Sequence, residues 1–168
     1  MTVLRVLYEE GRLDQASRGA LAETLTKAVL DVEVGVDSTL ARAGIMVLFD
    51  AIPPGRWAVG GRFDDTHVAA GGRCLIQAQA MEGVWTAARR RLLIERFSHA
   101  LSDALDLGRD AGALATCWVV FDQIADGSWG AMGSAISIRD LVEPAQFTPD
   151  RGADIERALL APSPLRCD

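Results

Sequence analysis

The pattern of apolar and polar positions occurs twice along this chain. Each half opens with a short apolar segment, residues 3–8 and 74–79, of a kind typical of β-strands. Apolar residues then recur at intervals of three and four, which predicts one buried face of a helix in each half. The recurring positions are Leu21, Leu25, Ala28 and Val29 in the first half and Leu93, Phe97, Ala100 and Leu101 in the second.

A second apolar run follows each predicted helix, at residues 45–49 and 117–121. These runs are continuous rather than alternating, which is typical of a strand covered on both faces. Glycine-containing turns around Gly55 and Gly127 then predict a hairpin at the end of each half. The pattern therefore predicts a β-α-β unit followed by a hairpin, twice, with parallel main strands joined by a helical crossover.

Individual residues support a duplication as well. Phe49 and Trp57 recur as Phe121 and Trp129, at a constant offset of 72 positions. Large and rare residue types at one offset indicate a tandem repeat. Short polar side chains at equivalent positions, Asp14 and Thr86, are predicted to cap the two helices because their oxygens can accept an unpaired backbone N–H of the first turn.

The repeats divide the chain into four segments within one compact domain. The first repeat spans residues 1–61, a linker spans 62–73, the second repeat spans 74–141, and a C-terminal arm spans 142–168. The arm has no counterpart in the first half, and its prolines leave room for one short helix near residues 155–160. We expect the arm to pack on the body, to fray, or to cross to another subunit.

Composition is that of an ordinary globular domain. With 168 residues, 49% of them hydrophobic and 24% charged, the chain is long enough for one well-buried core. No stretch approaches a membrane span and the N-terminus lacks a signal-peptide layout, so we expect a cytoplasmic protein. The three cysteines, Cys74, Cys117 and Cys167, are an odd number without paired spacing and are expected to be reduced.

Charge and motifs exclude several classes of function. A net charge of −6 and a pI near 4.9 argue against a nucleic-acid partner, which requires a basic face. His67 and His99 have no ligand-type residue at metal spacing, and neither a P-loop nor a dinucleotide fingerprint is present. We therefore expect no metal or other cofactor, no nucleic-acid or membrane partner, and a small molecule as the ligand or substrate.

A strand ending in Glu-Gly-Arg, a helix, a second strand and then Gly-x-aromatic-x-x-Gly-Gly resembles the tautomerase superfamily, of the 4-oxalocrotonate tautomerase type. Residues 10–12 and 55–61 carry the resemblance, and residues 82–83 and 127–133 carry a weaker copy. The layout is similar to that of fused two-repeat members such as cis-3-chloroacrylic acid dehalogenases and malonate semialdehyde decarboxylases. The resemblance implies an α/β pseudo-dimer of tandem β-α-β repeats, with a four-stranded sheet and two helices on one face. By analogy it also implies a homotrimer.

The resemblance implies an amino-terminal proline as general acid or base, and this chain departs from it there. Thr2 occupies the proline position, and Cys74 occupies the equivalent position in the second half. With Met1 retained, the nitrogen of Thr2 is an amide, which is not a base. Removal of Met1 would give Thr2 a primary α-amine that could still transfer protons, so Thr2 is the catalytic candidate.

The resemblance also suggests residues that contact the substrate. Arg12 matches an arginine associated with a substrate carboxylate, Trp57 matches an aromatic pocket residue, and Met46 replaces a second-strand arginine. Val29 and Val120 stand where dehalogenase-like members have water-activating His and Tyr side chains, so hydrolytic dehalogenation is excluded.

Other interpretations of these residues remain open. Arg12 is alternatively a solvated or subunit-contact arginine, and Trp57 a packing residue. Cys74 is either an inert buried thiol or a nucleophile, and Trp118 belongs to the core, to a subunit interface or to the site. Two functions follow: a divergent isomerase or lyase for a small oxo or enol compound that lacks the proline base, or a catalytically silent trimeric binding or structural module.

Overall fold

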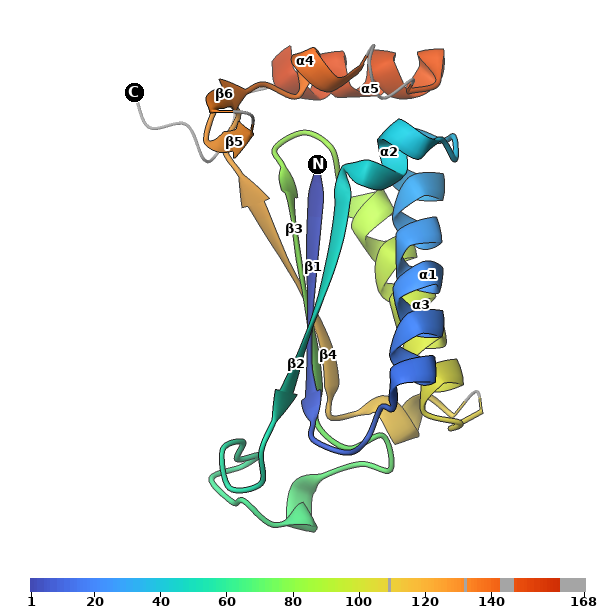
Figure 1. The fold of residues 1–168 in the computed structure, drawn as a ribbon, viewed down its shortest axis with the longest axis vertical. Helices are drawn as coiled ribbons and strands as arrows, with labels where there is room; N and C mark the ends of the chain where they lie inside the picture. Colours follow the sequence, from blue (N-terminus) through green and yellow to red (C-terminus); the bar gives the residue numbers. More distant parts are fainter. Residues whose placement is uncertain (109, 132, 143–146, 161–168) are drawn as a thin grey trace.

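The structure, a computed structural model, describes residues 1–108, 110–131, 133–142 and 147–160. A four-stranded sheet forms one layer, and two long helices cover one of its faces (Figure 1). In sheet order, the strands are β2 (Ile45–Ile52), β1 (Thr2–Glu9), β3 (Cys74–Met81) and β4 (Cys117–Ile124), and the helices are α1 (Gln15–Val29) and α3 (Ala87–Ala104). No helix in the described ranges combines the length and the apolar character needed to cross a membrane.

The strand pairing confirms the predicted repeat. β1 is parallel to β2 and β3 is parallel to β4, whereas β1 and β3 run antiparallel at the centre of the sheet. Arg5 pairs with Gln77, its equivalent at the 72-residue offset, so a pseudo-two-fold axis passes between these two residues. The fold is thus a pseudo-dimer of β-α-β units within one chain.

Side chains that alternate along the strands form the core. Leu4, Val6 and Ile76 point toward the helices and are fully buried, and they pack with helix residues such as Leu21 and Phe97. Both predicted helix caps are present: the Asp14 carboxylate accepts from Ser17 N at 2.7 Å, and Thr86 Oγ1 accepts from Arg89 N at 3.4 Å. The apolar spacing in the sequence therefore located both helices and their buried faces.

The opposite face of the sheet is open in the single chain. Met46 and Trp118 on the outer strands are 55% and 61% exposed, and Leu48 and Val120 lie beside them on the same face. The prediction that these strands are covered on both faces is therefore wrong for one chain, because only the helices cover the sheet. The exposure of Trp118 also excludes the core as its position.

Short elements connect the main ones. The π-helix η1 (Leu30–Val34) extends α1, and α2 (Thr39–Ala43) leads into β2. The second half has a hairpin of β5 (Trp129–Ala131) and β6 (Ser134–Ile136), but the first half keeps only an isolated bridge between Val59 and Arg62. The linker contains the 3-10 turn η2 (Asp65–His67), and a second 3-10 turn, η3 (Ala111–Leu114), precedes β4.

The C-terminal segment lies across the end of the sheet where β1 begins (Figure 1). It forms α4 (Arg139–Val142) and α5 (Pro149–Leu160), so the predicted short helix is present and begins six residues earlier than expected. Pro149 is compatible with this start because the first helical position has no backbone N–H bond to lose. Arg151 and Ile155 are buried, so α5 packs on the body of its own subunit.

Candidate functional site

A buried carboxylate lies at the N-terminal end of β1. Glu33 is 3% exposed, and its Oε2 accepts a hydrogen bond from Thr2 Oγ1 at 2.6 Å. Its Oε1 is 3.7 Å from the α-ammonium nitrogen of Met1. One carboxylate thus contacts both the first amine of the chain and the hydroxyl of the next residue.

The π-helix brings Glu33 to this position. Its widened turn is closed by a bond from Gly35 N to Leu30 O at 2.8 Å, and Gly35 ends the helix with a φ of 81°, a conformation that glycine adopts without steric cost. Single π-turns inside helices occur frequently at functional sites. Here the turn directs a glutamate inward from a segment whose other buried members, Leu30, Val32 and Val34, are apolar.

Two arginines hold the carbonyl groups of this turn. Arg151 donates from Nε to Glu33 O at 2.7 Å and from Nη2 to Val84 O at 2.9 Å, and Arg89 donates to Val32 O at 2.6 Å. Arg151 is 6% exposed, and its burial lowers the pKa of the guanidinium to about 10. Cations at the C-terminal end of a helix are favourable, because the carbonyl groups there carry partial negative charge.

A cavity of about 430 Å³ opens beside Met1 and Glu33. Its walls come from α2, the start of β2, the β5–β6 hairpin, α4 and the segment before α5, and they are mainly apolar. The largest of these side chains are Leu40, Ile45, Ile136, Leu141 and Phe147. Glu33 and Asp140 are the charged side chains among the described residues that line it.

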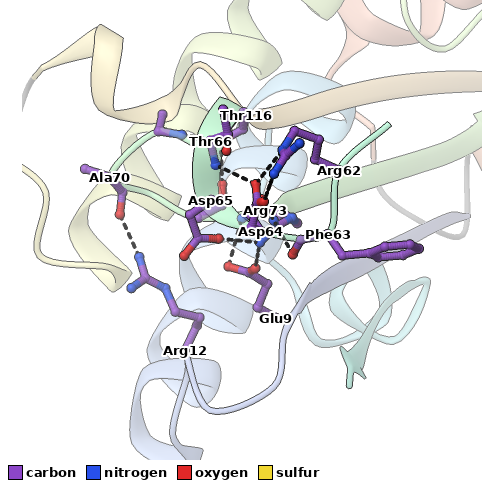
Figure 2. A network of polar contacts seen from close by, with 12 residues as sticks. Glu9, Arg12, Arg62, Phe63, Asp64, Asp65, Thr66, Ala70, Arg73 and Thr116 are labelled. Carbon is purple, nitrogen blue, oxygen red and sulfur yellow. Dashed lines mark hydrogen bonds and ion pairs between the residues drawn. The ribbon is translucent and has the colours of Figure 1, made fainter. Parts of the chain in front are cut away.

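The opposite end of β1 has a different chemistry. Arg12 and Trp57 line a cleft of about 270 Å³ there, and Arg12 Nη2 donates to Ala70 O at 2.7 Å. Figure 2 shows the adjoining polar network, in which Arg73 pairs with Glu9 and, at 3.0 Å, with Asp65.

Arg73 is the centre of this network. It is 5% exposed, and its Nη2 also donates to the carbonyl oxygens of Phe63 and Asp64, at 3.1 and 2.7 Å (Figure 2). Arg62 pairs with the Asp64 carboxylate and holds its pKa well below the usual range. These contacts fasten the linker to the end of β1, so the charges at this end bind mainly one another.

Apart from Cys74, the residues suggested by the sequence lie in three places. Thr2 is at the beginning of β1, whereas Arg12 and Trp57 share the cleft beyond its end, more than roughly 20 Å away for a strand of this length. Met46 and Trp118 lie on the open face of the sheet. Within one subunit the structure brings Arg12 and Trp57 together and places neither of them beside Thr2.

Cys74 lies in the sheet beside Cys117, its partner in strand register. Burial raises the pKa of the Cys74 thiol to about 12 and that of the Cys117 thiol to about 11, although the nearby charge of Arg12 acts in the opposite direction on Cys117. Thiolates are therefore scarce at neutral pH, which is characteristic of inert structural cysteines. Cys167 lies outside the described residues.

Glu33 and Arg151 were missed by the sequence analysis. Residues 30–34 alternate between apolar and acidic side chains, so the sequence does not separate buried Glu33 from exposed Asp31, and no local pattern marks Arg151. Among the residues with described placement, no group of three or more His, Cys, Asp and Glu side chains is arranged to hold a metal ion. The polar groups at this cavity, called the N-terminal cavity below, belong to Met1, Glu33 and Asp140, and Thr2 acts through its bond to Glu33.

Neither a protein-family model nor a curated protein sequence matches the chain. Solved structures do resemble it. A wild-type fused 4-OT described as an asymmetric trimer has a TM-score of 0.63 and 21% identity, over 79% of this chain and 94% of the other. A member of the cis-3-chloroacrylic acid dehalogenase family, N1, has a TM-score of 0.65 and 19% identity, over 92% and 99%. Pt0534 inactivated by 2-oxo-3-pentynoate has a TM-score of 0.64 and 19% identity, over 83% and 98%. The chain thus has the tautomerase-superfamily fold in its two-repeat layout.

Replacement of Thr2 by valine tests the buried contact with Glu33. Thr2→Val keeps the shape of the side chain and removes one hydrogen bond to a buried carboxylate, so the free energy of unfolding should fall by roughly 1.5–3 kcal/mol. Urea denaturation at a fixed protein concentration measures the change. Thr24→Val, on the exposed side of α1, is the matched control and should change stability by less than about 0.5 kcal/mol. Equal stability of the two variants would contradict the proposed contact.

Alkylation tests the two buried thiols. In a Cys167→Ser background at pH 8, Cys74 and Cys117 should react slowly with iodoacetamide, because pKa values of about 12 and 11 leave few thiolates. In urea both should react at the rate of a free cysteine. Mass spectrometry of timed samples gives the two rates. Rapid labelling of Cys74 in the folded protein would restore it as a candidate nucleophile.

Proposed function

We propose that this chain, with its tautomerase-superfamily fold, is an isomerase or lyase that transfers protons on a small oxo or enol compound without an amino-terminal proline. One observation carries the proposal. An α-amine and a buried carboxylate, 3.7 Å apart, lie at the wall of an apolar cavity of about 430 Å³. An acid and a base at hydrogen-bonding reach of one ligand are what enolisation requires.

The two groups have complementary roles in the proposed reaction. The Glu33 carboxylate takes a proton from the carbon next to a carbonyl group, and the Met1 ammonium donates a proton to the carbonyl oxygen, which gives the enol. The proton then passes from Glu33 to the amine and restores both groups, so no other reactant is consumed. The apolar walls strengthen both interactions because they exclude water.

Thr2 has a positioning role in this proposal. Its hydroxyl donates to one oxygen of Glu33 and leaves the other facing the amine, while its amide nitrogen donates to Gly44 O at 2.9 Å. If Met1 is removed, Thr2 becomes the first residue and its own nitrogen is the α-amine. N-terminal mass analysis identifies which residue provides the nitrogen.

A catalytically silent binding module is the second candidate. The ion pair between Met1 and Glu33 favours it, because the two charges already compensate each other without a ligand. The two candidates differ in one measurement. An enzyme of the proposed kind exchanges the α-protons of a bound carbonyl compound with solvent, whereas a binding module holds the compound without exchange.

Substitution of Glu33 tests whether its carboxylate is the base of the proposed reaction. Glu33→Gln keeps the size of the side chain and removes the base, so kcat/KM for enolisation should fall by about 10²–10⁴-fold. Deuterium exchange at the α-carbons of small ketones and keto acids in D₂O, followed by NMR, measures proton abstraction without knowledge of the natural substrate. Glu95→Gln, on the exposed side of α3, is the control and should retain the wild-type rate. Equal exchange rates in wild type and Glu33→Gln would show that Glu33 is not the base.

We also propose that the protein is a homotrimer. The open face of the sheet exposes Met46, Leu48, Trp118 and Val120, and contiguous apolar surfaces of this kind usually mark a protein interface. The structural resemblance to a fused 4-OT described as a trimer supports three subunits as the expected number.

Light scattering tests the assembly and the face that forms it. Wild-type protein at micromolar concentration should have a mass near three times the 18.0 kDa of one chain. Trp118→Glu should dissociate it, because it places a charge in an apolar interface. Phe63→Glu is the matched control, because Phe63 is equally exposed, at 61%, but lies in the linker. A monomeric wild type, or a trimer that tolerates Trp118→Glu, would contradict this interface.

A further inference from the structure

The charged groups that line the N-terminal cavity indicate which class of carbonyl compound the cavity binds. The described residues of its lining contribute two carboxylates, Glu33 and Asp140, and one cation, the Met1 ammonium. No arginine, lysine or histidine side chain is among those lining residues. The Met1 ammonium already faces Glu33, so the described part of the lining offers no free cation to an anionic ligand.

The nearby arginines are engaged elsewhere. Arg151 and Arg89 donate to backbone carbonyl groups of Val32, Glu33 and Val84, and Arg89 also pairs with Asp154 at 2.5 Å. Neither of them lines the cavity. Their positive charge stabilises the π-turn and is not directed at a ligand.

Arg12, the residue expected to bind a substrate carboxylate, lies at the other end of β1 and donates to Ala70 O. No described residue of the same subunit therefore supplies a cationic anchor for a carboxylate at this cavity, apart from the paired Met1 ammonium. The cavity walls, in contrast, supply Ile45, Ile136, Leu141 and Phe147 for contact with a hydrocarbon body. Its volume is within the range of small-molecule sites.

We infer that the N-terminal cavity binds an uncharged carbonyl compound with an apolar body, such as an aryl or branched-alkyl ketone or aldehyde, and rejects the corresponding keto acid. This inference rests on the proposed function, because it assigns the ligand class of the same site. The carbonyl oxygen is oriented by the Met1 ammonium and the α-carbon faces Glu33. A carboxylate on the ligand would lose hydration against the apolar walls without a free cation among the described lining residues, and exposed Asp140 adds a negative charge beside it.

A matched pair of ligands tests the inference. Phenylacetone and phenylpyruvate differ in that a methyl group of the ketone replaces the carboxylate of the keto acid. Isothermal titration calorimetry on the full chain should give a dissociation constant for phenylacetone at least tenfold lower than for phenylpyruvate. Tighter binding of phenylpyruvate, or the absence of binding by both compounds, would overturn the inference.

Leu40→Arg supplies the missing cation. Leu40 lines the cavity and is 56% exposed, so an arginine there can reach a ligand without burial of its own charge. The variant should bind phenylpyruvate at least tenfold more tightly than the wild type does. Leu160→Arg, at a leucine that is 79% exposed on α5 and outside the cavity lining, adds the same charge and should not change the preference. An equal gain in both variants would show a general charge effect and overturn the assignment to this cavity.

Arg12→Ala tests whether Arg12 of another subunit binds the ligand carboxylate at this cavity. If wild type prefers phenylpyruvate and Arg12→Ala abolishes that preference, Arg12 of another subunit completes the cavity and the inference is wrong. Deuterium exchange measured on the same two compounds tests the proposed catalysis separately from the ligand class. Tight phenylacetone binding without exchange supports the ligand class and contradicts the enzyme, whereas exchange on phenylpyruvate alone supports the enzyme and contradicts the ligand class.

Discussion

The antiparallel pairing of β1 with β3 is the constraint on which the rest of the structure depends. Its register joins Thr2 to Ala80 and Tyr8 to Cys74, so each repeat begins beside the place where the other repeat ends. The parallel partners β2 and β4 then extend the sheet outward, and both crossover helices must lie on the same face. Two topologically equivalent ends result, and duplication allowed their side chains to diverge.

Buried charges lie at both ends of the sheet, and the compensation of Arg73 differs from that of Glu33. Arg73 is surrounded by carboxylates and carbonyl oxygens of its own chain, so it serves to fasten the linker. Glu33 is compensated by a hydroxyl and by the α-ammonium of Met1, which also lines a cavity. A buried charge requires such partners, because desolvation without them is costly. Met1 and Glu33 line the larger space, about 430 Å³, whereas Arg73 and its partners Glu9 and Asp65 line a cleft of about 270 Å³.

The C-terminal arm helps to create this difference. Phe147 forms part of the cavity wall, and Arg151 binds the carbonyl oxygens of Glu33 and Val84, which belong to the first and second repeats. A segment without an equivalent in the first half thus covers one end of the sheet and leaves the other to the linker. The asymmetry of the molecule therefore comes from the segments added to the repeats more than from the repeats themselves.

Local spacing determined much of the fold, because strand, helix and cap signals depend on residues a few positions apart. The buried positions Leu21 and Phe97, the caps Asp14 and Thr86, and the duplication itself were all readable in this way. The tertiary structure alone decided the rest. Thr2 and Glu33 meet across 31 positions, and Arg151 reaches Val84 across 67, so no short pattern records either contact. Arg12 is close to Thr2 in sequence and far from it in space, because an extended strand separates them. The continuous apolar run that contains Trp118 could not show which of its faces stays open, because both faces carry apolar side chains and only the packing of the helices distinguishes them.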